Sequence, residues 1–197
     1  MCLLFETIKI SEGTPQNLKY HINRIRSSRL NLFGEAFSND IEKFLSNFTL
    51  NSNKNYKLKV LYSKSIIDYR ISEYSIIPKR GIKFYELPEL KYPYKFVNRK
   101  IFEEIEKDLE LDEIGIITQN GYLTDATYAN IVLFDGTNYY TPDNCLLNGT
   151  KRAKLLNEKK ICSTQIHIRD LNKYKNLQII NAMIDLEDNL KINLQTT

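Results

Sequence analysis

The sequence predicts an α+β protein of two lobes. Strands and helices come in separate runs along the chain and do not alternate as βαβ units. The length of 197 residues is enough for two lobes that each bury a core. Residues 88–94 contain two prolines and no hydrophobic periodicity, which is typical of an extended connector. We therefore expect a smaller N-terminal α+β domain at residues 1–88 and a C-terminal domain at residues 89–197.

The first lobe is predicted to contain strands whose residues alternate between apolar and polar, and helices with apolar residues at helical spacing. The predicted strands are residues 3–10, 56–62, 66–74 and 81–87, and the predicted helices are residues 18–33 and 39–48. On the first helix, Arg24 shares a face with Ile25 and Leu32. Either its stem covers apolar surface, or its guanidinium group is directed at an anion.

The second lobe is predicted to begin with a helix over residues 101–109, whose charged run at 103–108 faces solvent. Short apolar runs then predict further strands. These strands are residues 114–118, 131–134, 138–140 and 177–180. Gly149 and Thr150 are expected to begin another helix, after a turn at Thr141 and Pro142.

Composition excludes several classes of protein. The chain is 42% hydrophobic and 26% charged, which is ordinary for a folded globular protein, and no apolar run approaches the roughly 18 residues of a membrane span. Its start lacks the pattern of a secretory signal, so we expect a cytoplasmic protein. The net charge of +4 is spread among acidic residues, so neither nucleic acid nor membrane is an expected partner. Three separated cysteines and two histidines predict no metal site.

The stretch Gly121–Phe134 is the most informative part of the sequence. Asn120 and Gly121 form a hairpin turn signal, and the residues from Ile131 to Phe134 suit a buried strand. Between them lie Asp125 and Asn130, in a segment that should otherwise be core. A buried carboxylate needs a partner, and a cationic ligand atom is one candidate. The alternative is that Asp125 and Thr127 cap a local turn.

Several short motifs occur in an order that resembles the class IV aminotransferase family of pyridoxal-phosphate enzymes. The resemblance runs from about Phe5 to about Leu186 and so covers most of the chain. Its motifs are Phe5-Glu6-Thr7, His21-x-x-Arg24-x-x-x-Ser28, Lys95-x-x-Asn98-Arg99, the Asp125 to Asn130 stretch, and Leu147-Asn-Gly149-Thr150-Lys151-Arg152. The resemblance implies a fold of two lobes with the cofactor site between them, in which the C-terminal domain binds the cofactor.

The resemblance also implies roles for particular residues. Lys95 is the implied catalytic residue, forming a Schiff base with pyridoxal 5'-phosphate and moving protons, although a lysine in this position is otherwise typical of a surface amine. Asp125 stands where the family has a glutamate that holds the cofactor ring nitrogen, so here the side chain is one methylene shorter. Arg24 and the Gly149 loop are the implied phosphate ligands, although such a loop can equally be a helix cap without a ligand.

The remaining implied contacts are less specific. The full set expected to bind the cofactor is Arg24, Asp125, Asn130, Leu147, Gly149, Thr150, Lys151 and Asn181. Arg99 and Ala182 are expected on the substrate side, Arg99 at the ring hydroxyl or at a substrate carboxylate. No metal is expected.

Within the family, the motifs Lys-x-x-Asn-Arg and Asn-Gly-x-x-Arg resemble the 4-amino-4-deoxychorismate lyase branch. The implied reaction yields 4-aminobenzoate and pyruvate, a step of folate biosynthesis linked to the aminodeoxychorismate synthase that supplies the substrate. One alternative is an aminotransferase for a small branched-chain or D-amino acid. Another is a relative that binds a phosphate ligand without turnover. The family also implies a homodimer. The chain is short for this family and lacks the usual Gly-Asp-Gly lead-in before Phe5.

Overall fold

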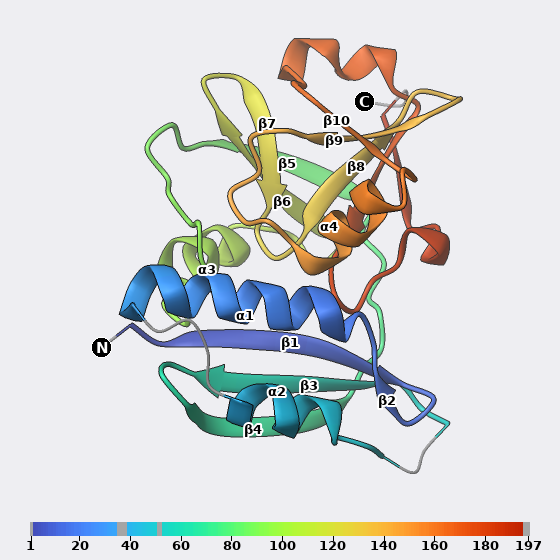
Figure 1. Cartoon of the computed structure of the whole chain (residues 1–197). Helices are drawn as coiled ribbons and strands as arrows, with labels where there is room; N and C mark the ends of the chain where they lie inside the picture. Colours follow the sequence, from blue (N-terminus) through green and yellow to red (C-terminus); the bar gives the residue numbers. More distant parts are fainter. Residues whose placement is uncertain (1, 35–38, 51–52, 195–197) are drawn as a thin grey trace. The chain divides into compact units, whose positions relative to one another are not determined.

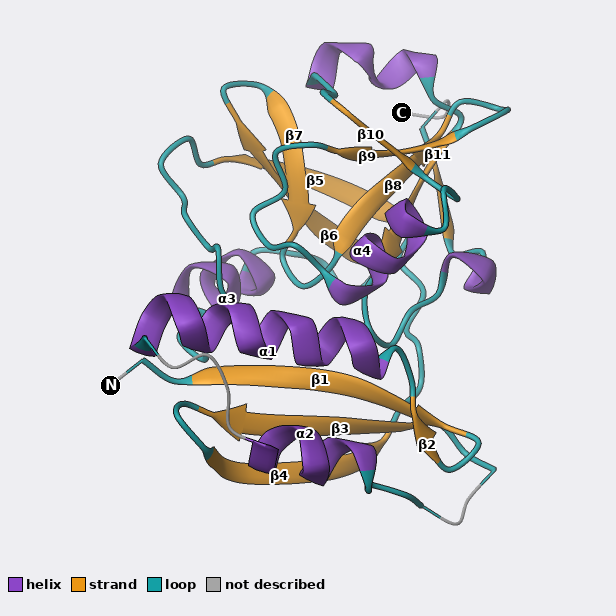
Figure 2. Cartoon of the chain, in the orientation of Figure 1, coloured by secondary structure: helices purple, strands orange, loops and turns teal. Residues whose placement is uncertain are grey.

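A computed structural model describes residues 2–34, 39–50 and 53–194, and the chain divides into two compact units (Figure 1). The first unit comprises Met1–Ile76 and Tyr94–Asn98, and the second comprises Ile77–Pro93 and Arg99–Thr197. Strands and helices are segregated along the chain, as predicted for an α+β protein (Figure 2).

The structure places the domain boundary differently from the predicted junction between residues 88 and 89. Residues 81–86 belong to the second unit because they pair in parallel with Glu113–Gln119 of that unit. Residues 94–98 return to the first unit because their backbone bonds to the first strand: Phe5 donates to the Lys95 carbonyl at 3.0 Å, and Val97 donates to the Leu3 carbonyl at 2.9 Å. Lys95 therefore lies in the first unit, and not in the C-terminal domain.

The first unit is a four-stranded antiparallel sheet with two helices. Strand order is β2-β1-β3-β4. The strands are β1 (Leu4–Ser11), β2 (Thr14–Pro15), β3 (Tyr56–Tyr62) and β4 (Ile66–Glu73), and the helices are α1 (Leu18–Phe33) and α2 (Asn39–Ser46). The first helix ends at Gly34, whose φ of 69° is a conformation that glycine adopts at low cost.

Packing in the first unit follows from the period of two in its strands. Leu4, Ile8 and Ile10 of β1 are fully buried and pack with Leu58 and Val60 of β3. The helices contribute to the same core through apolar side chains at helical spacing, namely Ile25, Ile41 and Leu45. The strands predicted at residues 3–10, 56–62 and 66–74 and the helices predicted at residues 18–33 and 39–48 are thus confirmed, whereas the strand predicted at residues 81–87 forms as β5 in the second unit.

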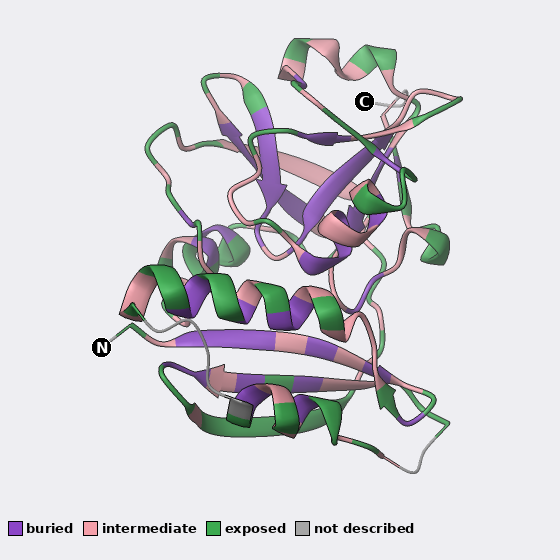
Figure 3. Ribbon diagram, viewed as in Figure 1, coloured by how far each residue is buried: buried purple, intermediate pink, exposed green. Residues whose placement is uncertain are grey.

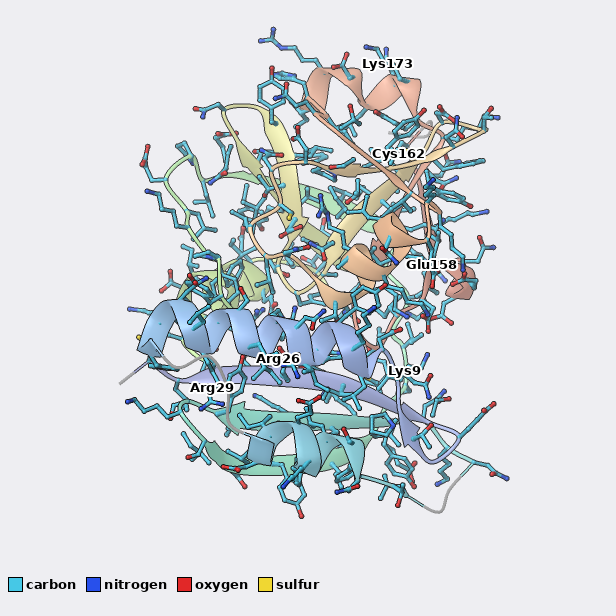
Figure 4. All side chains as sticks on the ribbon, viewed as in Figure 1. Lys9, Arg26, Arg29, Glu158, Cys162 and Lys173 are labelled. Atoms are coloured by element: carbon cyan, nitrogen blue, oxygen red, sulfur yellow. The ribbon has the colours of Figure 1, made fainter. Side chains whose placement is uncertain are left out.

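Two arginines of α1 show how the helix is divided between solvent and interior (Figure 4). Arg26 pairs with Glu42 of α2 at 2.7 Å, and both side chains are substantially exposed. Arg29 is 2% exposed and donates to the backbone carbonyl of Lys64. The second arginine therefore ties α1 to the β3–β4 turn.

The second unit contains a larger mixed sheet. Its path is β10-β9-β8-β7-β6-β5, and β11 pairs with β8 and with β12. The strands are β5 (Gly81–Glu86), β6 (Glu113–Gln119), β7 (Tyr122–Ala126), β8 (Asn130–Phe134), β9 (Tyr139–Pro142), β10 (Cys162–Thr164), β11 (Asn176–Ile180) and β12 (Lys191–Asn193). The helices are α3 (Lys100–Lys107), α4 (Thr150–Asn157) and the 3-10 turns η1 (Ile168–Lys173) and η2 (Leu186–Asp188).

The centre of this sheet is the buried part of the second unit (Figure 3). The hairpin at Asn120 and Gly121 joins β6 to β7 as predicted, and both residues have positive φ. Helix α4 packs Leu155 against Val132 of β8 and Ile180 of β11. The predicted turn at Thr141 and Pro142 is wrong: β9 continues through both residues, because its other neighbour β10 pairs with them in parallel.

Candidate active site

Asp125 lies at the end of β7, where that strand meets β8. Its partner on β8 is Asn130, and a short turn joins the two because Ala126 donates to the Ala129 carbonyl. The side chain of Asp125 is 4% exposed. Asn130 donates from Nδ2 to its Oδ1 at 2.6 Å, and the backbone N–H of Leu147 donates to its Oδ2 at 2.9 Å. Both carboxylate oxygens are therefore held by neutral donors.

The environment of Asp125 raises its pKa. Burial disfavours the charged carboxylate, and the hydrogen bonds from Leu147 and Asn130 and the charge of Arg152 offset that cost only in part, so its pKa is about 6. Within the described residues, Asp125 has no salt-bridge partner. The turn-capping alternative is not what is seen, because the donors come from Asn130 and from a segment 22 residues away in sequence. A buried carboxylate in this state would gain stability from a cationic N–H group.

Asn130 links Asp125 to the loop before α4. The same Nδ2 group donates to the Leu147 carbonyl at 2.9 Å. A Cβ atom at Gly149 would lie 1.9 Å from Oδ1 of Asn130, so only glycine allows the loop to approach this closely. The predicted residues Asp125, Asn130, Leu147 and Gly149 therefore form one contiguous group, the Asp125 cluster.

Helix α4 begins at Thr150, with Gly149 at its N-cap in an extended conformation. No side chain caps this end, which leaves backbone N–H groups and the positive end of the helix dipole at the predicted phosphate loop. Thr150 is 4% exposed. Lys151 is equally buried, and its ammonium group forms a salt bridge with Asp185. The loop backbone fits an anion better than the Lys151 side chain does.

Arg152 is a buried residue of this region to which the sequence analysis gave no role. It is 6% exposed, donates to the Pro142 carbonyl at 2.8 Å, and lies close enough to Asp125 to lower its pKa. Its Nε has no hydrogen-bond partner among the described residues. The signal that could have found it is an arginine in the first turn of a helix whose next turn supplies Leu155 to the core.

The other residues predicted in this unit have structural partners. Asn181 uses its side-chain oxygen to accept from the backbone N–H groups of Met183 and Ile184 at 2.8 and 3.0 Å, which forms a local turn around Ala182. Arg99 donates to the Thr127 carbonyl at 2.8 Å and stacks on the ring of Phe102. These contacts do not bring Asn181, Ala182 or Arg99 into the hydrogen bonds of the Asp125 cluster.

The first unit contains a second buried carboxylate, Glu6 of β1, which is 0% exposed. Arg24 bonds to both of its oxygens, with Nε to Oε1 at 2.8 Å and a terminal nitrogen to Oε2 at 2.6 Å. Nδ1 of His21 lies 2.7 Å from Oε2. Glu6, His21 and Arg24 together form the Glu6 cluster. Two nitrogens of Arg24, the predicted phosphate ligand, are therefore bound to a carboxylate of its own unit.

Charge in the Glu6 cluster is balanced internally. Burial alone would raise the pKa of Glu6, but the positive charge of Arg24 and the hydrogen bonds from His21 and Arg24 outweigh it and lower the pKa to about 2. Burial lowers the pKa of His21 despite the carboxylate beside it. His21 is therefore neutral at pH 7, and because an ionised Glu6 only accepts, the proton of the ring is on Nδ1.

The backbone carbonyl of Lys95 accepts a hydrogen bond from Phe5 of β1, and Lys95 is half-buried. The ammonium group lies 4.6 Å from the centroid of the Phe5 ring. Its charge also lowers the pKa of His21, so it lies within electrostatic range of the Glu6 cluster. Lys95 is thus adjacent to a buried ionic network and is not an isolated surface amine.

The sequence analysis gave no role to Glu6 and His21, although both stand in the quoted motifs. Glu6 shares its strand face with Leu4 and Ile8, so its alternation alone places a carboxylate in the core. His21 lies three residues before Arg24 on the same helix face. These two spacings are the signals that could have identified the Glu6 cluster.

The fold and both clusters can be compared with known proteins. The family model for amino-transferase class IV matches residues 3–186. The chain belongs to this family. It is therefore an enzyme of a family whose members depend on pyridoxal 5'-phosphate.

Three known proteins of nearly the same length are similar to this chain. A protein of Haemophilus influenzae with no assigned function is 30% identical over 183 residues, which are 91% of this chain and 97% of that protein. A provisionally named 4-amino-4-deoxychorismate lyase from Haemophilus somnus 129PT has a crystal structure that matches with a TM-score of 0.82 at 28% identity, covering 94% of this chain and 98% of that one. A provisionally named amino-acid aminotransferase from Mesorhizobium loti matches with a TM-score of 0.77 at 20% identity, covering 98% of each chain.

The described part of the chain also lacks two other kinds of feature. None of its helices is both long and apolar enough to cross a membrane. No group of three or more histidine, cysteine, aspartate or glutamate side chains is arranged to hold a metal ion among the same residues.

Proposed function

We propose that this member of the class IV aminotransferase family is a pyridoxal-phosphate-dependent lyase that converts 4-amino-4-deoxychorismate to 4-aminobenzoate and pyruvate. The observation that carries the proposal is Asp125, a buried carboxylate with neutral donors on both oxygens and a pKa of about 6. The likeness to the Haemophilus somnus protein supports the lyase branch. The motif Lys95-x-x-Asn98-Arg99 favours the same branch.

The residues of the Asp125 cluster fit the cofactor. A carboxylate whose pKa is raised by burial, and which has no cation within salt-bridge distance in the described chain, suits the protonated ring nitrogen of pyridoxal phosphate. Gly149 approaches Asn130 closely and no side chain caps helix α4 at Gly149, and the positive end of the helix dipole there suits a phosphate group. We assign Asn130 and Leu147 to holding Asp125, and Gly149 and Thr150 to the phosphate.

We also propose cofactor and substrate roles for five further residues, and these roles take account of the contacts that the residues make in the structure. Arg24 is assigned to the phosphate, and its two hydrogen bonds to Glu6 fix its position. Lys151 contributes positive charge near the loop while it is paired with Asp185. Asn181 and Ala182 are assigned to the rim near the phosphate and substrate, and Arg99 to a substrate carboxylate.

The proposed chemistry is an elimination driven by aromatisation. The bound cofactor supplies an electron sink for the pair of electrons left when a C–H bond breaks. Lys95 is the base that takes the proton from the amine-bearing carbon of the substrate, and the ionised Asp125 keeps the proton of the ring nitrogen in place. The C–O bond to the enolpyruvyl group then breaks with its electron pair on the oxygen, and the departing enolate takes up one proton, equivalent to the one that Lys95 removed, to become pyruvate. The remaining ring becomes aromatic as 4-aminobenzoate.

The deciding experiment uses the full chain reconstituted with pyridoxal phosphate and supplied with 4-amino-4-deoxychorismate. We expect 4-aminobenzoate and pyruvate in equal amounts. Lys95→Ala should abolish both products and also the visible absorption band of the lysine-bound cofactor. The matched control is Lys91→Ala, which removes an exposed lysine of the connector and should leave both readouts unchanged. A wild-type protein that binds the cofactor but releases neither product would refute the lyase activity.

An aminotransferase acting on a small branched-chain or D-amino acid is the second candidate, and the likeness to the Mesorhizobium loti protein favours it. This activity would give an oxo acid from the amino donor and leave the cofactor in its aminated form. Formation of an oxo acid without release of 4-aminobenzoate would select it.

We also propose a cytoplasmic homodimer that acts in folate biosynthesis. Its substrate would be the product of an aminodeoxychorismate synthase, which makes that enzyme a functional partner. Light scattering on the purified chain tests the dimer, and a monomeric mass would contradict it.

A further inference from the structure

Arg152 lies in the first turn of α4 and is buried against the sheet of the second unit. On the helix it lies three residues before Leu155, which packs against Val132 of β8 and Ile180 of β11. A terminal nitrogen of its guanidinium group donates to the Pro142 carbonyl at 2.8 Å. Arg152 is thus a cation enclosed within the second unit and not a surface side chain.

The contacts of Arg152 hold the beginning of the loop at residues 143–149, which connects β9 to α4. Pro142 is the last residue of β9, and the second acceptor of the guanidinium group, the hydroxyl of Ser163 at 3.3 Å, lies on the neighbouring strand β10. Farther along, the same loop donates a backbone N–H group to the carboxylate of Asp125 at 2.9 Å. Arg152 therefore anchors one end of the segment that holds this carboxylate.

These hydrogen bonds by themselves do not require a positive charge. A neutral amide could donate to the same carbonyl without the cost of removing a charge from water. Nε of Arg152 is buried and has no hydrogen-bond partner among the described residues, which adds to that cost. The adjacent Lys151 differs, because its ammonium group forms a salt bridge with Asp185. The buried charge of Arg152 therefore indicates an effect beyond anchoring.

Asp125 is the buried anionic group on which this charge acts. Among the charged side chains of the described residues, Arg152 has the largest effect on the pKa of Asp125, and it lowers that pKa while burial raises it. Burial and the charge of Asp125 raise the pKa of the Cys145 thiol to about 11, against the charge of Arg152, so the thiol is neutral wherever Asp125 titrates. Asp143 at the start of the loop is exposed, and solvent screens its charge.

We propose that Arg152 is a positioning residue for Asp125: it anchors the loop that donates to the carboxylate, and its charge keeps that carboxylate ionised. This role rests on the proposed function, because an ionised Asp125 is the form that leaves a proton on the ring nitrogen of the cofactor. The bond to Pro142 holds the guanidinium group beyond salt-bridge distance from Asp125. Arg152 can therefore stabilise the anion without competing with the ring nitrogen for it.

The first test measures the ionisation of Asp125 in the full chain without cofactor. At each pH the unfolding free energy of Asp125→Asn is compared with that of the chain that keeps the aspartate, in the wild-type background and again with Arg152→Gln. The pH at which this difference changes reports the titration of Asp125, and we expect loss of the cation to raise its midpoint by about one pH unit. Arg152→Lys keeps the charge and should restore a midpoint close to that of wild type.

The second test follows the loop through the Cys145 thiol, in a chain whose two exposed cysteines are replaced by Cys2→Ser and Cys162→Ser. Lysine keeps the charge but lacks the planar fork that reaches both acceptors of Arg152. In Arg152→Lys we therefore expect Cys145 to react with a disulfide reagent roughly threefold faster, as when opening of the loop no longer breaks one hydrogen bond.

The matched control is Arg169→Met, which removes an exposed arginine of η1 and should change neither readout. A midpoint that stays at the wild-type value in Arg152→Gln would overturn the effect of the charge, and an unchanged Cys145 rate in Arg152→Lys would overturn the anchoring. Arg152→Met is the second variant without charge, so failure of one variant to fold leaves the other to decide.

The product assay separates this role from the lyase activity. With cofactor and substrate present, the acid limb of the pH profile of product release should move to higher pH in Arg152→Gln, with the KM for substrate unchanged. A wild-type chain that releases neither product would refute the lyase, whereas the midpoint and the Cys145 rate would still decide the role of Arg152.

Discussion

Glu6 and Asp125 are both buried carboxylates, but their surroundings give them opposite properties. Glu6 contacts the guanidinium group of Arg24 and the ring of His21, and its pKa falls to about 2. In the described part of the chain, Asp125 accepts hydrogen bonds from the amide of Asn130 and from backbone N–H groups, and burial raises its pKa to about 6. Both sites supply hydrogen bonds, so the difference is whether a cation lies in direct contact.

This difference separates a completed ionic network from a site that still requires a cation. The charge of Glu6 is neutralised within its own unit, so we interpret the Glu6 cluster as a support that fixes Arg24 and keeps His21 neutral. The charge of Asp125 has no such partner in the described chain, and a cofactor with a protonated ring nitrogen would supply it. Three substitutions test this comparison.

The largest effect is expected from removing the cation beside Glu6. Arg24→Met leaves a buried carboxylate with only His21 as a partner, and it should lower the free energy of unfolding by about 3–5 kcal/mol. Urea denaturation of the protein without cofactor measures this change. The matched control is Arg26→Met on the same helix, which breaks an exposed pair with Glu42 and should cost at most about 1 kcal/mol.

Equal losses in the two arginine variants would show that the pair in the Glu6 cluster contributes no more than a surface contact. The double variant Glu6→Gln/Arg24→Met should recover part of the lost stability, because it removes the uncompensated charge. The pH dependence gives a further check. In wild type the stability that Glu6 contributes is present above pH 4.5 and is lost as the pH falls toward 2, since its folded-state pKa is depressed.

The second effect has the opposite pH dependence and concerns Asp125. Its folded-state pKa of about 6 lies above the ordinary value of 3.8, so the native protein without cofactor keeps a proton that the unfolded chain has lost. Wild type should therefore lose stability as the pH rises from about 4 to about 6, whereas Asp125→Asn should not lose this contribution. Between about pH 4 and about pH 6, the stability of Asp125→Asn relative to wild type should therefore increase by about 2–3 kcal/mol.

Thermal denaturation at several pH values measures this difference. Asp135→Asn is the control with the opposite sign, because backbone N–H groups of Asn138 and Thr137 lower the pKa of Asp135 and its contribution to stability is lost toward acid pH. If the difference in unfolding free energy between Asp125→Asn and wild type does not change with pH, the pKa of Asp125 is not raised in the folded protein, and a cation of the chain already pairs with its carboxylate. Added pyridoxal phosphate should reduce the pH dependence of wild type, if a cationic group of the cofactor reaches Asp125.

The smallest effect is expected at the loop beside Asp125. Gly149→Ala would place a Cβ atom 1.9 Å from Oδ1 of Asn130, so the amide must move away from Asp125 or the loop must shift. The backbone of Gly149 has a φ of −67°, which alanine accepts, so the whole cost of about 1–3 kcal/mol comes from the collision. Affinity for pyridoxal phosphate should fall as well, which cofactor titration by absorbance would show.

Gly81→Ala is the control for the loop, since its nearest neighbour is the flexible side chain of Glu113 at 3.0 Å. That variant should bind the cofactor as wild type does. If Gly149→Ala binds the cofactor with unchanged affinity, the loop before α4 is not a phosphate site, and the proposed role of Thr150 falls with it.

The elements of the fold were largely predictable because their signals are local. Period-two alternation predicts β1, β3 and β4, helical spacing predicts α1 and α2, and the Asn120-Gly121 turn predicts the β6–β7 hairpin. The domain boundary was not predictable in this way. Lys95 belongs to the first unit because its carbonyl accepts from Phe5, and this pairing across 90 residues of sequence leaves no local pattern.

The candidate site also has features that the sequence predicts and features that depend on residues far apart in the sequence. The sequence by itself determined that Asp125, Asn130 and Gly149 stand in ordered motifs, and that Glu6 and Arg24 occupy apolar faces of a strand and a helix. Only the tertiary structure decided the partner of each: Arg24 bonds to Glu6, Lys151 pairs with Asp185, and Asp125 has no salt-bridge partner among the described residues. The physical reason is that periodicity fixes which face a side chain occupies, whereas its partner and its pKa depend on residues brought near by folding.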